Sequence, residues 1–423
     1  MNKIVSLSVV LGVAACVSLR SPGTATAPVP PIGGKYKSGA DQPVRIALAT
    51  AASEGRISAT GDWRLFDGNG ETQIAAASAS QEWMVSPDGL RIRLGPTGSS
   101  PDPREGPIIA RPSPNGSYVK WNGKRYRGEL VISATDSGLL VVNRLSMDSY
   151  LRGVVPLEIG NRAAEEMAAV QAQAVAARTY AYKHLSDTRG FDMYATVQDQ
   201  VYGGMDAEKP LSDDAINTTR DIVVTYGGQP ITTPYHSTCG GSTAAVSEVW
   251  YTQPDEPYLR PVSDRIPGTN GFYCDASPRF SWTQSFDAAG LRAVMEKYLA
   301  AYTNAPKGSL GKITAVKEQG RTASDRVAAL IVQTESGNYT LRGNDIRLVL
   351  RNPTGAILNS TYFTFTTSEN GSEVTNLAVN GRGYGHGIGM CQWGAIGRAR
   401  AGQDYRTILQ KYYPGTTIGR IAG

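Results

Sequence analysis

The residue best suited to acid–base chemistry is Glu158, which directly follows the apolar run GVVPL at 153–157. A carboxyl group approached by apolar residues is poorly solvated, and poor solvation raises its pKa because it disfavours the charged form. A Glu that stays protonated near neutral pH can act as a general acid. The alternative interpretation is a Glu that only flanks the helix predicted after it.

Two of the three histidines lie in glycine-flanked segments. His236 is three residues before Cys239 in the segment Tyr235–Gly241, a spacing that is only a weak indication of a metal site. His386 lies in Gly381–Met390, where glycine alternates with other residues. Alternating glycines predict a loop whose backbone approaches a ligand closely and presents His386. Each histidine also has a purely structural interpretation.

Several common catalytic patterns are absent from the sequence. It contains no Walker A loop, no His-Glu-x-x-His and no Gly-x-Ser-x-Gly. The glycines of 381–389 do not open a βαβ unit with a following acidic residue, which excludes a dinucleotide fingerprint. Cys391 lies five residues after His386, whereas a nucleophilic Cys and its base usually come from separate elements.

The elements that must position these residues predict an α+β fold. Short apolar runs separated by turn residues indicate that 43–145 is mostly β-structure. An Ala-rich helix is predicted over about 163–185, where apolar residues recur at helical spacing. Further helices are predicted over 287–302, 392–401 and 405–412, and strands over 221–226, 230–235, 313–319, 327–334 and 338–342. We therefore expect a β-rich N-terminal part and a mixed α/β catalytic core with Gly-rich groove loops.

Composition limits the class of protein. The chain has 423 residues, 41% of them hydrophobic, which excludes wholesale disorder. Lys and Arg number 42 against 37 Asp and Glu, for a net charge of +5, and no basic block occurs. This balance does not indicate nucleic-acid binding.

The N-terminus predicts export and lipid anchoring. A basic start at 1–3 precedes an apolar stretch that is too short for a permanent membrane helix. The stretch ends in the sequence VAAC at 13–16, which resembles a bacterial lipobox and implies cleavage before Cys16 and lipidation of its thiol. The alternative is an ordinary signal peptide with an incidental Cys. We expect the protein at the periplasmic face, in the outer membrane because Val17 and not Asp follows the Cys.

Five segments stand out together: Leu145–Glu158, Gln171–Ala181, Gln200–Gly204, Tyr235–Gly241 and Gly381–Ala395. Their order resembles the SpoIID/LytB (sporulation stage II protein D) family of cell-wall proteins, over about 145–415. The division that follows is a lipoprotein signal peptide at 1–15, a Pro/Gly/Ser tether at 16–42, a β-rich region at 43–144 and a SpoIID-like catalytic domain at 145–423.

The resemblance implies a lytic transglycosylase that cleaves peptidoglycan between N-acetylmuramic acid (MurNAc) and N-acetylglucosamine (GlcNAc), leaving an anhydro sugar. It places the general acid at Glu158 and requires no cofactor for the chemistry. Hydrolysis uses two carboxylates, and the sequence offers Glu158 without an obvious partner. The alternative is a non-catalytic enhancer of a wall amidase, and a third possibility is a structural lipoprotein. The expected partners are glycan strands, a wall amidase and, through Cys16, the lipid bilayer, and not nucleic acid.

The substrate groove is predicted to be lined by Arg178, Gln198, Tyr202, His236, Ser237, His386 and Gln392. The chain departs from the sporulation prototype because it carries a lipobox in place of a membrane helix and Cys391 where Ser is frequent. The lipobox points to wall remodelling in a vegetative, Gram-negative cell.

With Cys16 lipidated, three cysteines remain. Zinc-bearing relatives imply a tetrahedral site formed by His236, Cys239, Cys274 and Cys391, which would be a closed, structural zinc. The rival is a Cys239–Cys274 disulfide in an oxidising periplasm. The sequence leaves both open.

Lipid anchoring is tested by Cys16→Ala. The variant loses the acylated thiol, so we expect it in the soluble fraction or unprocessed, whereas the wild type stays on membranes after a salt wash. Equal membrane retention of the two proteins would rule out the anchor.

Overall fold

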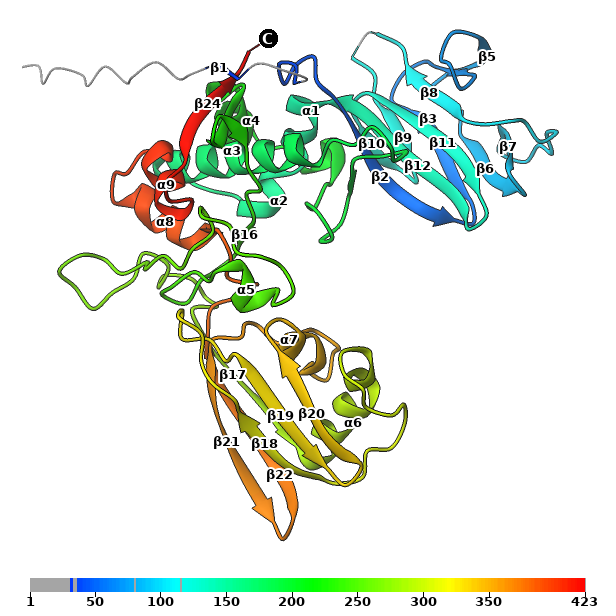
Figure 1. Ribbon diagram of the computed structural model, residues 1–423. Coiled ribbons are helices and arrows are strands. Elements are labelled where there is room, and N and C mark those ends of the chain that lie inside the picture. Colours follow the sequence, from blue (N-terminus) through cyan, green and yellow to red (C-terminus); the bar gives the residue numbers. More distant parts are fainter. Residues whose placement is uncertain (1–30, 33–35, 80, 115, 423) are drawn as a thin grey trace, which may run out of the picture.

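The computed structural model describes residues 31–32, 36–79, 81–114 and 116–422 (Figure 1). The predicted signal peptide and lipidated Cys16 lie outside the described residues, as does most of the tether. Within the described ranges, no helix combines the length and the apolar character needed to cross a bilayer. The mixture of helices and several sheets confirms the α+β fold class.

The N-terminal part is a β lobe, as predicted for 43–145 (Figure 1). Its strands are β2 Pro43–Ala52, β3 Gly55–Ala59, β4 Trp63–Phe66, β5 Gln73–Ala77, β6 Trp83–Asp88, β7 Arg91–Pro96, β8 Ile108–Pro112, β9 Val119–Trp121, β10 Lys124–Tyr126, β11 Glu129–Thr135 and β12 Gly138–Ser146. They form a five-stranded sheet in the order β10-β9-β3-β6-β7 and most of a seven-stranded sheet, β13-β2-β12-β11-β8-β4-β5. The short β13, Met193–Tyr194, joins the edge of this second sheet and so ties the central part to the β lobe.

The central part is built around α3, Met167–His184. Its alanines are small and almost all buried, so neighbouring elements approach its axis closely. The elements beside it are α1 Met147–Arg152, α2 Val155–Ile159, α4 Pro210–Thr218, β14 Ile222–Tyr226, α8 Gln392–Arg400 and α9 Tyr405–Tyr412. Of these, α8 and α9 match the predicted helices, whereas α1, α2 and α4 were not predicted.

A third part of the chain forms a separate β-rich lobe with its own hydrophobic core (Figure 1, yellow to orange). Its elements are β17 Ser281–Asp287, α6 Ala288–Tyr298, β18 Ile313–Glu318, β19 Ala329–Thr334, β20 Gly337–Arg342, α7 Asp345–Val349, β21 Phe363–Asn370 and β22 Glu373–Arg382. Two three-stranded sheets, β17-β22-β21 and β18-β19-β20, pack with α6 and α7. The buried residues of 145–423 therefore fall into two clusters, one of them confined to 286–379.

A short parallel pair connects distant parts of the sequence. β16, Tyr235–His236, pairs with β23, Met390–Cys391, so that His236 is in register with Cys391. The predicted strand over 230–235 is largely irregular, with only β15 Gln229–Pro230 at its start and the first residue of β16 at its end.

The alternating glycines that precede β23 serve backbone packing. Gly383, Gly385, Gly387 and Gly389 all have positive φ values. A Cβ on Gly389 would lie 2.1 Å from the carbonyl oxygen of Pro234, and one on Gly383 would lie 2.6 Å from that of Thr238. The expectation that these glycines bring the backbone close to a ligand is therefore corrected: they bring it close to the segment that contains β16.

This packing predicts that Gly389→Ala is more damaging than Gly371→Ala. Both positions have positive φ, but nothing lies within 4 Å of a Cβ at Gly371. We expect Gly371→Ala to lower the free energy of unfolding by about 1–2 kcal/mol, the cost of the left-handed backbone. Gly389→Ala adds overpacking of about 1–3 kcal/mol. Denaturant unfolding measures both, and equal losses would contradict the packing argument.

Candidate active site

Glu158 lies on the short helix α2, which begins after the buried Val154 and has Pro156 in its first turn. Its side chain is half-buried, and its Oε1 accepts a hydrogen bond of 2.8 Å from the backbone N–H of Val201. That donor belongs to the loop 195–201, which follows β13 and includes the first two residues of the QVYGG segment at 200–204. The carboxyl group is thus held between a helix and a loop.

Burial raises the pKa of Glu158 to about 6, against the opposing effect of the Val201 N–H bond. Among the described residues no Lys or Arg contributes to this pKa. A carboxyl group with a pKa near 6 and no ion-pair partner keeps an appreciable protonated fraction near neutral pH. It has the property required of a general acid.

Three tyrosines lie near enough to Glu158 for its charge to affect them. Burial raises the pKa values of Tyr150, Tyr180 and Tyr235, and the nearby charge of Glu158 raises them further. Their hydroxyl groups therefore remain protonated and act as hydrogen-bond donors or acceptors, without adding charge to the site.

Side chains of the 195–201 loop fix these tyrosines. Tyr235 Oη donates to Gln200 Oε1 at 2.8 Å, and Gln200 Nε2 donates to Tyr150 Oη at 3.2 Å. Tyr180 Oη donates to Asp199 Oδ1 at 2.8 Å. Gln200 and Asp199 were missed as site residues, although Gln200 begins one of the five segments that carry the resemblance. Its isolated position in a loop gave no periodic signal.

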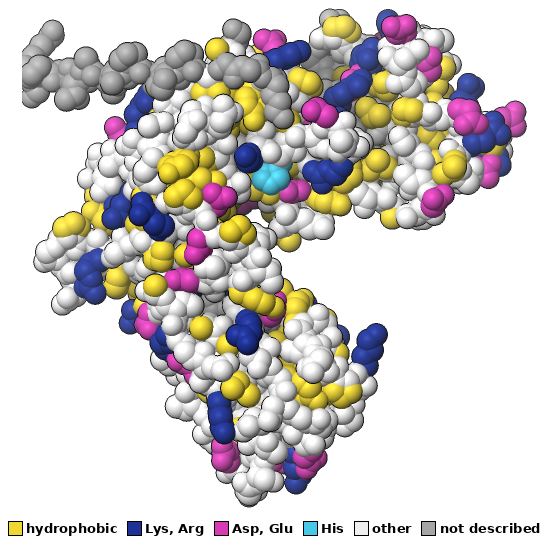
Figure 2. All heavy atoms as spheres, viewed as in Figure 1, with side chains coloured by type: hydrophobic (Ala, Val, Ile, Leu, Met, Phe, Trp, Pro, Cys, Tyr) yellow, Lys and Arg dark blue, Asp and Glu magenta, His cyan; other side chains and the backbone are white. Residues whose placement is uncertain are grey.

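Exposed apolar side chains lie beside Glu158 in the sequence and on the loop that contacts it. Leu157, next to Glu158, is 45% exposed, and Val197, in the 195–201 loop, is 87% exposed. Gln198 is also exposed on this loop, as a residue that contacts substrate must be. On the face shown in Figure 2, acidic and basic side chains are interspersed and gather into no patch of a single charge.

Arg178 does not line a groove. Its side chain is completely buried on α3, and it donates to the backbone oxygens of Thr219, Ile222 and Ile216 at 2.8–3.3 Å. Asp148 lies 3.9 Å from its guanidinium. The prediction for Arg178 is therefore corrected to a structural role, because its donors close the end of α4 and the start of β14.

Tyr202 and Gln392 are also internal. Tyr202 Oη donates to Asn143 Oδ1 at 2.7 Å, and its ring packs on that of Tyr150. Gln392 is buried at the start of α8, where its Nε2 donates to Gln173 Oε1 at 3.2 Å. Both predicted contacts with glycan are corrected, since these side chains join elements of the core.

His386 is half-buried, and both of its ring nitrogens are used. Nδ1 accepts from the Ile388 N–H at 3.0 Å, and Nε2 therefore carries the proton that it donates to the Tyr235 oxygen at 2.9 Å. Burial lowers its pKa to about 4, so the ring is neutral at pH 7. His386 thus has no nitrogen left for a glycan or a metal, and it supports the strand that carries Tyr235.

His236 and Ser237 follow Tyr235. His236 is buried, donates from Nδ1 to the Ile388 oxygen at 3.1 Å, and has an unpartnered Nε2 among the described residues. Its ring lies 5.4 Å from that of His386. Burial lowers its pKa, which keeps it neutral. Ser237 is half-buried, with its Oγ 3.2 Å from the hydroxyl of Thr238.

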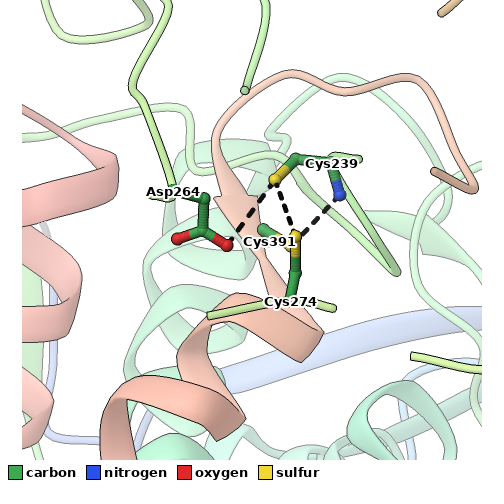
Figure 3. A group of neighbouring side chains, drawn as sticks. All are labelled: Cys239, Asp264, Cys274 and Cys391. Atoms are coloured by element: carbon green, nitrogen blue, oxygen red, sulfur yellow. Dashed lines mark hydrogen bonds between the residues drawn. The ribbon is translucent and has the colours of Figure 1, made fainter. Parts of the chain in front are cut away.

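The three cysteines meet, but His236 is not their fourth neighbour. The sulfurs of Cys239, Cys274 and Cys391 lie close together, with a carboxylate oxygen of Asp264 beside them (Figure 3). The predicted ligand set is corrected accordingly, because the only described polar partner of the His236 ring is a backbone oxygen. Asp264 was missed because it lies outside every segment that carries the resemblance.

Two family models match separate stretches of the chain. Residues 135–226, which contain Glu158 and the 195–201 loop, match the family model described as Stage II sporulation protein. Residues 244–389, which contain the third lobe, match a model described only as a domain of unknown function, DUF8618.

Relatives cover more of the chain. An uncharacterized protein of Brachyspira hyodysenteriae is 29% identical over 89% of this chain and 92% of its own length. The protein named Amidase enhancer of Bacillus subtilis is 31% identical over 63% of this chain, but this match covers 40% of the enhancer. Stage II sporulation protein D of Bacillus subtilis is 29% identical over 66% of this chain and 75% of its own length. These matches support the resemblance to the SpoIID/LytB family for the part of the chain that they cover.

Proposed function

We propose that the chain is a peptidoglycan lytic transglycosylase with Glu158 as its catalytic acid. One observation carries the proposal: Glu158 is a carboxyl group with a pKa raised by burial to about 6, held by the Val201 N–H and without a cationic partner among the described residues. A carboxylate kept only for structure is normally paired with a cation or fully solvated. Similarity of residues 135–226 to the Stage II sporulation protein family model supports the same assignment.

The reaction needs a single carboxyl group. Glu158 donates its proton to the glycosidic oxygen between MurNAc and GlcNAc, and the bond from that oxygen to C1 of MurNAc breaks. The C6 hydroxyl of the same MurNAc then bonds to C1, and its proton passes to the Glu158 carboxylate. The products are a 1,6-anhydro end and a free GlcNAc end, and no water is consumed.

The surroundings of Glu158 suit a sugar chain. Leu157 and Val197 offer exposed apolar surface, on which the C–H faces of sugar rings can pack. Gln198 offers an amide that can donate and accept hydrogen bonds. The N–H of Val201 holds one carboxylate oxygen of Glu158 and leaves the other to face the scissile bond.

The place of action follows from the same proposal. Peptidoglycan lies outside the cytoplasmic membrane, so the chain must be exported. A lipid on Cys16 would hold it at the periplasmic face, in the outer membrane, with the segment to about residue 42 as a tether.

A second function has its own support. The relative named Amidase enhancer suggests a non-catalytic protein that binds peptidoglycan and stimulates a wall amidase. Such a protein has no need for a proton donor at Glu158. The two functions therefore predict different effects of a substitution that removes the proton donor at Glu158.

Glu158→Gln should abolish cleavage while leaving the fold intact. Gln can still accept the Val201 hydrogen bond but cannot donate a proton of matched pKa, so we expect a loss of about 10²–10⁴ in rate. Mass spectrometry of glycan strands without stem peptides detects the anhydro ends. Glu165→Gln, which changes an exposed Glu at the start of the neighbouring helix, is the control and should keep full activity.

The pH profile gives a second readout on the wild type. Only the protonated acid donates, so the rate should fall about tenfold per pH unit above about 6. Near-full cleavage by Glu158→Gln would place the acid elsewhere. A wild type that releases no anhydro product yet accelerates an amidase would establish the second function.

The raised pKa also predicts a pH-dependent stability difference. The folded protein binds the Glu158 proton more tightly than the unfolded chain does. Protonation therefore stabilises the fold below the ordinary pKa of 4.5, and this contribution is lost as pH rises through about 6. At pH 8 Glu158→Gln should unfold with a free energy up to about 2 kcal/mol higher than wild type. Below pH 4 the difference should vanish.

A further inference from the structure

A buried cluster of four potential ligands lies apart from Glu158. The sulfurs of Cys239, Cys274 and Cys391 and a carboxylate oxygen of Asp264 all lie within 4.8 Å of one another, and all four residues are buried (Figure 3). Cys239 follows β16, and Cys391 ends β23. Asp264 and Cys274 come from the segment that leads into the third lobe. The cluster thus joins three stretches that are distant in sequence.

We propose that Cys239, Cys274, Cys391 and Asp264 bind one zinc ion in a closed, tetrahedral, structural site. Zinc–sulfur bonds of about 2.3 Å in a tetrahedron place neighbouring sulfurs about 3.8 Å apart. The sulfurs of Cys239 and Cys274 are 3.5 Å apart, and Cys239 Sγ is 3.7 Å from Asp264 Oδ2. Small side-chain rotations bring these ligands to the required distances. The proposal does not depend on the chemistry of Glu158.

Asp264 is oriented as a ligand by its other oxygen. Its Oδ1 accepts hydrogen bonds from Tyr412 Oη at 2.7 Å and from Arg398 Nη2 at 2.9 Å. Its Oδ2 is left to face the cysteines. Hydrogen bonds of this kind fix a carboxylate for metal binding. Gly394 makes room for it, since a Cβ there would lie 2.4 Å from Oδ2.

Cys391 has the surroundings of a bound thiolate. It is the N-cap of α8, and its sulfur accepts the backbone N–H groups of Cys239 at 3.1 Å and Gly394 at 3.2 Å. The positive end of a helix dipole favours a negatively charged sulfur. N–H donors directed at a sulfur have the same effect, as outer-shell partners of a metal site do.

Two buried arginines lie beside the cluster. Arg398 pairs with Asp264, and Arg326 is a second buried guanidinium, with 1% exposure. Among the described residues Arg326 has no ion-pair partner, and its Nη2 donates to the backbone oxygens of Cys239 and Ser242. A buried cation without an anion is costly. Three thiolates, one carboxylate and Zn²⁺ carry a net charge of −2, which these two arginines balance.

The donor types select zinc among the common metals. Thiolates are soft ligands that Mg²⁺ and Ca²⁺ avoid, and a tetrahedral set of sulfur with one oxygen suits Zn²⁺. Four protein ligands leave no open position, so the ion holds structure and performs no catalysis. The rival for the same residues is a disulfide between Cys239 and Cys274, which leaves Cys391 as a free thiol.

The full chain, purified without added chelator, decides between these states. We expect about one zinc per chain by elemental analysis. With Cys16 replaced by Ala, three thiols should remain, and they should react with a thiol reagent only after zinc is chelated. Cobalt exchanged into the protein should give the absorption of a tetrahedral thiolate site. A Cys239–Cys274 disulfide, or three free thiols without metal, would overturn the proposal.

Variants test the ligand set. Asp264→Asn keeps the shape but removes the charge, and we expect zinc affinity to fall at least tenfold, with a changed cobalt spectrum. His236→Gln is the matched control, because it alters a buried polar residue near the cluster that is not a ligand, and it should keep full zinc. Full zinc with an unchanged cobalt spectrum in Asp264→Asn would remove Asp264 from the site. If a variant does not fold, the cobalt spectrum of the wild type still supports or overturns the proposal.

Discussion

The burial of a single carboxyl group is the constraint on which the site depends. Taking Glu158 out of water costs free energy, and the described residues include no cation that offsets this cost at the carboxylate. The position can be maintained only if the elements around it are rigid. The alanines of α3 provide this, because they let α2 pack closely against a helix that is itself buried on nearly every side. The 195–201 loop then covers the acid and gives it one N–H donor.

A second layer holds that loop in place and comes from much later in the sequence. Gln200 bonds to Tyr235, and the backbone oxygen of Tyr235 accepts from His386. His386 is in turn fixed by its own loop through the Ile388 N–H. The glycine-rich loop therefore supports the acid only indirectly, through Tyr235 and Gln200. Neither ring nitrogen of His386 is available for chemistry. This explains why segments that look catalytic in the sequence are almost entirely satisfied by hydrogen bonds within the protein.

Sequence patterns predicted what depends on local periodicity. The β-rich 43–145, the helix α3 and the two C-terminal helices follow from spacing of apolar residues, and the apolar approach to Glu158 correctly indicated its burial. The roles of Arg178, Tyr202 and Gln392 could not be predicted in this way. Each is decided by partners that are tens to hundreds of residues away, such as Asn143 for Tyr202. The same holds for Asp264, whose orientation depends on Arg398 and Tyr412.

The cysteine cluster and the acid site are linked through the short pair β16–β23. Cys391 is in register with His236, and Tyr235 with Met390, so anything that fixes Cys391 also fixes the strand that carries Tyr235. The cluster stands at the entry to the third lobe, because Asp264 and Cys274 lie in the stretch that precedes β17. A bond that joins Cys391 to Asp264 or Cys274 would restrain β23 and the entry to the third lobe together. Displacement of β23 would also move the paired β16 and its Tyr235. Through the bond from Tyr235 to Gln200, it would then reach the loop that covers Glu158. The strongest potential cross-link of the chain therefore lies where it steadies the acid site.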